Sequence, residues 1–248
     1  MTNDMDTLQC SFIEIAERIN AKLDFKPRRC LDNRVLEAQY MDGRWTTTTT
    51  FVRSIFLPSE KPNLCIFLIL ESPHYDEFLS NPPMPAAGTT GDYIEEHLEK
   101  VLNTHVRKPK GLEEGTTFDV VLMNAVQFQT SLGVSPPSVY RDDVFRPLWR
   151  RGGNEDFRTR LADNLEQGDI IINACTSGKK PRDNQIKLRE SVEIVVQSVA
   201  SKCGNSTYRV EHPINWGRIV NTANKYETEL SFAWQSLSDR YIELTGQN

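Results

Sequence analysis

Four short, largely apolar runs, separated by helical patterns, organise the hydrophobic and polar positions along this chain. The runs cover residues 64–70, 118–123, 169–174 and 207–210. Their apolar residues are consecutive rather than alternate, which is typical of strands buried on both faces in a parallel sheet. Because strands alternate with helices, the pattern predicts an α/β protein. We expect a three-layer α/β/α sandwich with a central, mainly parallel sheet of about four strands.

Amphipathic helical patterns lie between and around these runs, with apolar residues three and four positions apart. They cover residues 7–23, a segment opened by Gly91, a segment that starts at Asn154, residues 183–203 and residues 226–244. Residues 34–57 alternate loosely instead and contain the hairpin signal Asp42-Gly43, so an antiparallel ribbon or edge element is expected there. With no internal repeat or linker, residues 1–248 are predicted to form a single domain.

Polar and aromatic side chains follow each of the four runs. Ligands of α/β sheets bind beyond the carboxyl ends of the strands, so the site is expected among these residues. They are Glu71, Ser72, His74, Tyr75, Asp76 and Glu77, then Asn124 and Phe128, then Lys179 and Lys180, and finally His212, Asn215, Trp216 and Arg218. Ordinary alternatives exist, such as a solvated loop acid for Glu71, a turn cap for Asn124 or a satisfied core histidine for His212. Their occurrence at four successive strand ends favours a functional site.

Composition narrows the class of protein. The 248 residues carry a formal net charge of −5, which disfavours a dedicated basic nucleic-acid module, since such modules have a pI above about 9. The chain starts without an apolar signal-peptide region, and no stretch approaches the ~18–20 apolar residues of a membrane span. Five cysteines, without a C-x-x-C pair, favour reduced thiols over a disulfide framework or a zinc site. We therefore expect a cytoplasmic protein that does not contact membranes.

The strand ends resemble motifs of the uracil-DNA glycosylase superfamily, in which an apolar strand is followed by a G-[QEIM]-[DNA]-P-[YG] loop. Residues 71–77 (ESPHYDE) are closest to the G-E-A-P-G-x-x-E pattern of its bacterial iron–sulfur branch, which Glu71, Pro73 and Glu77 fit. Three further segments resemble its G-x-x-G, L-L-N-A-V and H-P-S-P-L motifs: residues 88–91 (GTTG), 122–126 (LMNAV) and 212–216 (HPINW). The order and spacing of these motifs fit the superfamily across residues 64–220.

Departures from the superfamily pattern change what the resemblance implies. The four cysteines that hold the iron–sulfur cluster lack their spacing here, so no cluster, and no other cofactor or metal, is expected. Ser72 replaces the catalytic Asp of the uracil-specific branch, and His74 replaces the Tyr that excludes larger pyrimidines. Phe128, Tyr75 and Tyr93 are alternatives for the aromatic residue that stacks on the base. These changes predict a pocket that is not restricted to uracil.

The resemblance implies a monofunctional base-excision reaction. The target base leaves the stack, and its N-glycosidic bond breaks through an oxocarbenium-like state. Glu71 is expected to stabilise the sugar cation and orient water, with Asp76 and Glu77 as catalytic alternatives. His212 would hydrogen-bond the departing base anion.

The base-binding and DNA-binding residues follow from the same resemblance. Asn124 would read the flipped base, because its amide offers a donor and an acceptor. The other base-binding residues would be Ser72, His74, Tyr75 and Phe128. Trp216, beside Asn215, would fill the gap in the duplex, unless it is a core residue.

Basic residues near the strand ends are the expected phosphate contacts. Lys179, Lys180 and Arg218 would share the rim of the site, although a solvated surface is the alternative for each. Gly178 would let the backbone approach a phosphate closely. Acidic residues gather more in the helical segments, so a net charge of −5 is compatible with a monomer that binds single- or double-stranded DNA.

The motifs do not specify which base is excised. One substrate is a modified cytosine, such as glucosylated hydroxymethylcytosine in phage DNA, which would imply a role in anti-phage defence. Another is uracil or a different deaminated base, which would imply repair. A nucleoside N-glycosidase that acts on small molecules and a catalytically inactive DNA-binding protein are further alternatives.

Overall fold

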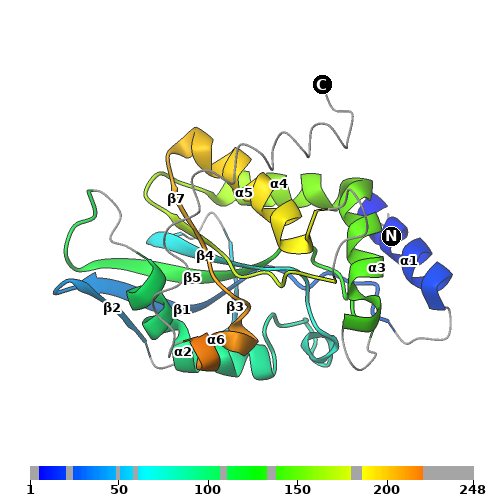
Figure 1. Cartoon of the computed structure of the whole chain (residues 1–248), viewed down its shortest axis with the longest axis horizontal. Helices are drawn as coiled ribbons and strands as arrows, with labels where there is room; N and C mark the ends of the chain where they lie inside the picture. The colour runs from blue at the N-terminus through cyan, green and yellow to red at the C-terminus, as the bar shows by residue number, and fades with distance from the viewer. Residues whose placement is uncertain are drawn as a thin grey trace.

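A mixed β-sheet forms the centre of the structure, a computed structural model that describes residues 6–20, 25–48, 51–57, 61–106, 111–132, 138–179 and 186–219 (Figure 1). Its strand order is β2-β1-β5-β4-β6-β7, and β3 pairs with β1. Helices flank the sheet, which confirms the predicted α/β class. The sheet is wider than the four strands that the apolar runs predict, because an antiparallel ribbon extends one edge.

All four apolar runs form strands. The strands within the described residues are β1 (Asn33–Met41), β2 (Arg44–Thr47), β3 (Ser54–Ile55), β4 (Leu64–Leu70), β5 (Thr116–Asn124), β6 (Ile170–Asn173) and β7 (Ser206–Arg209). β4 pairs in parallel with β5 and β6, and β6 pairs in parallel with β7. β1 pairs antiparallel with β2, β3 and β5. The β1–β2 hairpin turns at Asp42 and Gly43, whose φ angles of 54° and 77° are those that a two-residue type I′ turn requires.

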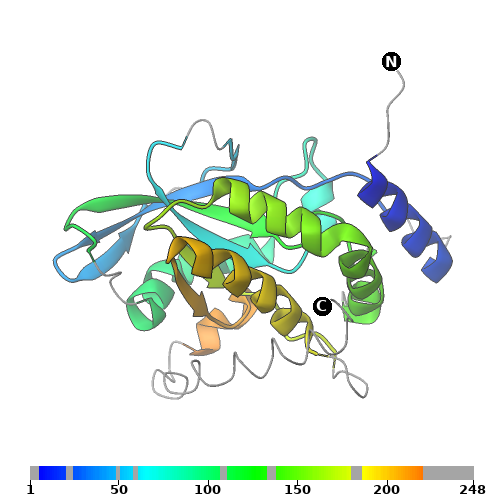
Figure 2. The same ribbon diagram turned by 90° about the horizontal axis from the view of Figure 1, so that it is seen from above.

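Helices cover both faces of the sheet. They are α1 (Thr7–Asn20), α2 (Thr89–His105), α3 (Ser138–Leu148), α4 (Asn154–Asn164), α5 (Leu188–Cys203) and the short α6 (Trp216–Ile219), with the single turns η2 (Tyr75–Phe78), η3 (Trp149–Gly153) and η4 (Pro213–Asn215). Figure 1 shows α4 and α5 on one side of the sheet and α2 and α6 on the other, and Figure 2 shows α4 and α5 crossing the same face. The predicted helix at 226–244 lies outside the described residues.

The residues of β4 explain why its apolar run is continuous. Cys65, Phe67 and Ile69 pack with α1, α3, α4 and α5 on one face of the sheet. Ile66, Leu68 and Leu70 pack with α2 on the other face, and all six side chains are buried. An alternating pattern would have left one face polar, so consecutive apolar residues place β4 in the middle of the sheet. Its carboxyl end therefore opens among neighbouring strand ends.

Candidate functional site

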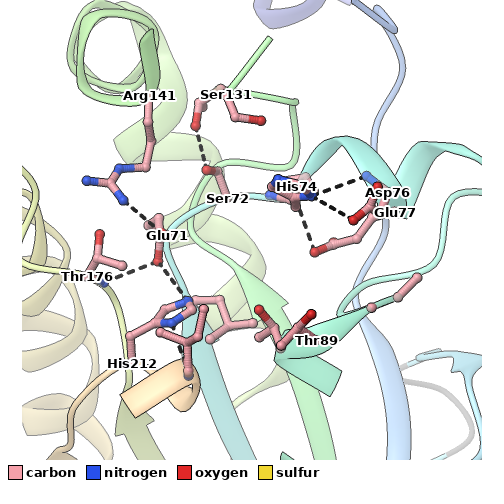
Figure 3. Close-up of a pocket in the computed structure, with 17 residues that line it drawn as sticks. Glu71, Ser72, His74, Asp76, Glu77, Thr89, Ser131, Arg141, Thr176 and His212 are labelled. Atoms are coloured by element: carbon pink, nitrogen blue, oxygen red, sulfur yellow. Dashed lines mark hydrogen bonds and ion pairs between the residues drawn. The ribbon is translucent and has the colours of Figure 1, made fainter. Parts of the chain in front are cut away.

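A cavity of about 340 Å³ opens beyond the carboxyl end of β4 (Figure 3). Its walls come from the loop after β4, the start of α2, the segment after β5, α3, and the loops after β6 and β7. Small-molecule sites span about 300–1,000 Å³, so the cavity is large enough for a nucleobase. The cavity lies where ligands of α/β sheets bind, beyond the carboxyl ends of the parallel strands.

Glu71 is the central acid of the cavity and is only 6% exposed. Its backbone oxygen accepts a hydrogen bond from the amide of Val126 at 3.0 Å, so strand pairing continues past β4 and fixes the residue. Its Oε2 accepts a hydrogen bond from the amide of Thr176 at 3.2 Å. Nη1 of Arg141 lies 3.8 Å from Oε1, and Nε2 of His212 lies 3.8 Å from Oε2 (Figure 3). These neighbours offset the cost of burying a carboxylate beside the cavity.

His212 enters the cavity from the loop after β7. It is the N-cap of η4, and its Nδ1 accepts a hydrogen bond from the amide of Ile214 at 3.4 Å. A neutral imidazole that accepts at Nδ1 carries its proton on Nε2, the nitrogen that faces Glu71. His212 therefore presents a hydrogen-bond donor to the cavity, as expected of a residue that stabilises a leaving group.

Glu77, at the other end of the loop after β4, has a different environment. Burial raises the pKa of its carboxyl from 4.5 to about 8, although hydrogen bonds from the amides of His74 and Ala86 favour the charged form. The Cys30 thiol donates to Glu77 Oε2 at 3.8 Å. A carboxyl that is mostly protonated at neutral pH is poorly suited to stabilise a sugar cation. The environment thus favours Glu71 over Glu77 for this role.

Three other predicted residues of this loop also line the cavity. Ser72 Oγ lies 2.6 Å from Thr130 Oγ1, which joins the loop to the segment after β5. His74 Nδ1 accepts a hydrogen bond from the amide of Asp76 at 3.4 Å and lies 3.2 Å from its Oδ2. The exposed Asp76 is therefore turned toward His74, whereas Tyr75 is half-buried in η2 and is not among the described residues that line the cavity.

Sequence reasoning missed three residues that shape the cavity: Arg141, Ser131 and Thr176. Arg141 comes from α3, a helix that the hydrophobic pattern did not predict. Ser131 follows β5 by several residues, and Thr176 contributes its backbone amide to Glu71. Of these three residues, only Thr176 could have been identified from the sequence, because it lies just after a predicted strand.

Two of the predicted base-binding residues are buried away from the cavity. Asn124 is 2% exposed, and its Oδ1 has no hydrogen-bond partner among the described residues. Phe128 is fully buried, stacks on Phe12 with 5.1 Å between ring centroids, and lies beneath the guanidinium of Arg29. Packing against α1, a segment distant in sequence, accounts for the position of Phe128. The structure therefore does not bring Asn124 or Phe128 to the cavity.

The loop after β7 buries one of its two large apolar residues, Trp216, and exposes the other, Ile214. Trp216 is 1% exposed, and its Nε1 donates to the backbone oxygen of Glu211 at 2.7 Å. It therefore occupies the core position that was its alternative, where it cannot reach into a duplex. Ile214 is 50% exposed and lines the cavity. Asn215 is half-buried in η4, and its amide donates to the His212 oxygen at 2.9 Å.

The expected phosphate contacts are only partly described. Lys179 Nζ donates to Val139 O and to Asp143 Oδ2, at 2.6 and 3.1 Å, so its ammonium is held against α3. At Gly178, with φ at +76°, a Cβ would lie 2.6 Å from Asp142 Oδ2, so this glycine permits close approach to α3. Lys180 and the side chain of Arg218 lie outside the described residues.

Comparisons with protein-family models, curated proteins and solved structures found no match for this chain. Within the described ranges, no group of three or more His, Cys, Asp or Glu side chains is arranged to hold a metal ion. The helices that can be described include none with the length and apolarity needed to cross a membrane. The function is therefore inferred from the residues around Glu71.

Proposed function

We propose that this protein is a monofunctional DNA glycosylase, which flips a base out of DNA and hydrolyses its N-glycosidic bond to leave an abasic site. The observation that carries the proposal is the buried Glu71 carboxylate, which faces a base-sized cavity together with the Nε2 donor of His212. The motifs that resemble the uracil-DNA glycosylase superfamily support it, because their residues 71–77 and 212–216 both contribute to this cavity.

In the proposed reaction, the bond between C1′ and the base nitrogen breaks, and its electron pair leaves with the base. Glu71 stabilises the positive charge that develops on the sugar and accepts a proton from the water that adds to C1′; this proton is then passed on to the departed base anion, which leaves as the neutral base. His212 Nε2–H donates to the departing base and stabilises its negative charge. Thr176 and Arg141 hold the carboxylate of Glu71 in place.

We infer a three-layer α/β/α sandwich with a mainly parallel central sheet, to which the ribbon of β1, β2 and β3 is added at one edge. The parallel pairing of β4 with β5 and β6, and of β6 with β7, supports this description. Two separate core clusters, one on each side of the sheet, support it as well.

For the duplex, we propose that Ile214 fills the gap left by the flipped base. Its side chain is half exposed and lines the cavity, two residues after His212. Apolar side chains inserted between base steps act in this way in other DNA-binding proteins. The substrate is proposed to be DNA that carries a modified cytosine, which would suit anti-phage defence, or a deaminated base, which would suit repair.

The test uses oligonucleotides of one sequence that contain uracil, unmodified cytosine, hydroxymethylcytosine or glucosylated hydroxymethylcytosine. After incubation with the protein, alkali cleaves the strand at abasic sites. We expect breaks on at least one non-standard base and their loss with Glu71→Gln. Glu211→Gln is the matched control, because Glu211 precedes His212 but pairs with Arg189 at 3.2 Å. Binding without breaks on any of the four substrates would instead indicate an inactive DNA-binding protein.

A nucleoside N-glycosidase is the second candidate function. Two residues that were expected to contact DNA are engaged within the protein, and this observation favours it. Trp216 is buried, and Lys179 is paired with Asp143. Release of free base from nucleosides, with salt-insensitive substrate binding, would support this function. A DNA enzyme should instead bind an oligonucleotide with an affinity that falls as salt rises.

A further inference from the structure

Arg141 presents a guanidinium nitrogen to the cavity. Its side chain comes from α3 and is only 16% exposed. Nε and Nη2 donate to Asp142 Oδ1 at 3.2 and 3.1 Å, which fixes one edge of the guanidinium. Nη1 faces Glu71 at 3.8 Å, beyond hydrogen-bond distance, and makes no hydrogen bond with the residues that the structure describes. Arginine nitrogens only donate, so Nη1 is suited to bind an acceptor that enters the cavity.

Asp142 holds this geometry in place. It is 3% exposed, its Oδ2 accepts a hydrogen bond from the backbone amide of Lys179 at 2.8 Å, and Arg146 Nη2 lies 3.6 Å from the same oxygen. The carboxylate thus joins α3 to the loop after β6. A guanidinium that is fixed before the ligand arrives loses little conformational entropy on binding.

Ser131 is a second, independent sign of a ligand on the same side of the cavity. It is 4% exposed, lines the cavity, and its buried Oγ has no hydrogen-bond partner among the described residues. Figure 3 shows Ser131 and Arg141 on the same side of Glu71. A buried hydroxyl without a partner is unfavourable, so a ligand that bonds to it would gain affinity.

We propose that Arg141 and Ser131 form a subsite that binds an oxygen acceptor on the excised base. This inference rests on the proposed glycosylase function and assigns base reading to residues other than Asn124. The guanidinium of Arg141 only donates, so it favours a keto oxygen or the hydroxyl of a base substituent. It disfavours the exocyclic amino group of unmodified cytosine, because donors would face donors, whereas the Ser131 hydroxyl can donate or accept.

Two pairs of substrates, in each of which one member lacks an oxygen, test the subsite and separate the two sources of the acceptor. In duplexes of one sequence, uracil is compared with 2-pyrimidinone, which lacks the 4-oxygen and, with it, the N3 proton. Likewise, 5-hydroxymethylcytosine is compared with 5-methylcytosine, which lacks the hydroxyl. We expect wild-type kcat/KM to favour the oxygen-bearing member of at least one pair by about 10- to 100-fold, the range for a hydrogen bond to a charged group. That pair identifies the acceptor.

Variants of both subsite residues should reduce this preference. We expect Arg141→Met to bring it close to one, and Ser131→Ala to lower it by several fold. Ser131→Ala breaks no hydrogen bond to a described residue, so its effect on folding should be small. Arg146→Gln is the matched control, because Arg146 shares Asp142 but does not line the cavity, and it should retain the preference.

Binding measurements keep this test separate from that of the proposed function. In a Glu71→Gln background, affinities for the same oligonucleotides should show the same preference, and Arg141→Met should remove it. Active enzyme whose preference survives Arg141→Met and Ser131→Ala would overturn the subsite alone. No excision of any base would overturn the glycosylase function, and equal affinities within both pairs would then overturn the subsite too.

Discussion

The two ends of the loop after β4 carry two buried glutamates in opposite environments. At its start, Glu71 receives a hydrogen bond from the Thr176 amide and faces Arg141 and His212. At its end, Glu77 is buried beside the Cys30 thiol, and burial raises the pKa of its carboxyl to about 8. Both side chains line the same cavity, so sequence motif and location alone do not separate them.

Burial raises the pKa of the Glu77 carboxyl although backbone amides donate to it. What distinguishes Glu71 is its two basic neighbours, Arg141 and His212. Pairs of acids with divergent environments often divide catalytic roles in this way. Glu71 has neighbours that favour its charge, whereas Glu77 ties the loop together through its hydrogen bond from the His74 amide at 3.2 Å. We therefore expect Glu71 to be required for chemistry and Glu77 for loop structure.

The largest expected effect comes from exchanging the two acids for amides. Glu71→Gln should lower the rate of base excision by about 100- to 1,000-fold, because charge stabilisation in the transition state is lost. Glu77→Gln should change the rate much less at neutral pH, because its carboxyl is already mostly uncharged there. Single-turnover measurements of alkali-sensitive sites provide the comparison. Equal losses in the two variants would contradict the division of roles.

The second-largest effect is expected on the free energy of unfolding and its dependence on pH. Between the usual pKa of 4.5 and the folded value of about 8, folded Glu77 holds a proton that the unfolded chain has lost. Its contribution to the free energy of unfolding therefore falls as pH rises through this window, by up to about 1.4 kcal/mol per pH unit. Glu77→Gln should remove this slope in urea unfolding between about pH 5 and 8. Parallel curves for the wild type and the variant would show that Glu77 is charged when folded.

His212 should have a smaller effect than Glu71. Removing its donor with His212→Ala should slow excision by about 10- to 100-fold, the range for hydrogen bonds to charged groups. The loss should shrink for 5-fluorouracil, whose anion leaves more readily than that of uracil and needs less help. Rates for these two bases in otherwise identical DNA measure this dependence. The same loss on both would assign His212 a structural role only.

The smallest effect is expected from Ile214, which lines the cavity and follows His212 by two residues. Ile214→Ala should reduce excision from duplex DNA about two- to fivefold, as expected for a partly buried aliphatic contact. Excision from single strands should not change, because no gap in a duplex has to be filled. Paired assays on the two forms of DNA test this. Equal reductions would argue against insertion into the duplex.

Local patterns predicted most of the described elements correctly. The consecutive apolar residues of 64–70 became β4, and Asp42-Gly43 became the β1–β2 turn. α3 was missed, and with it Arg141; the segment includes Pro147, a residue type that usually ends or kinks a helix. The loop residues Glu71 and His212 were found because the carboxyl ends of parallel strands lie at one edge of a sheet.

The sequence by itself determined the α/β class, the strand positions and the loops after β4 and β7 that reach the cavity, because these depend on residues close together in the chain. Only the tertiary structure decided which side chains face the cavity. Asn124, Phe128 and Trp216 followed predicted strands, yet all three are buried. Their positions depend on contacts with distant segments, such as Phe12 of α1 for Phe128. The same long-range contacts bring Arg141 and His212 to opposite oxygens of Glu71 and so distinguish it from Glu77.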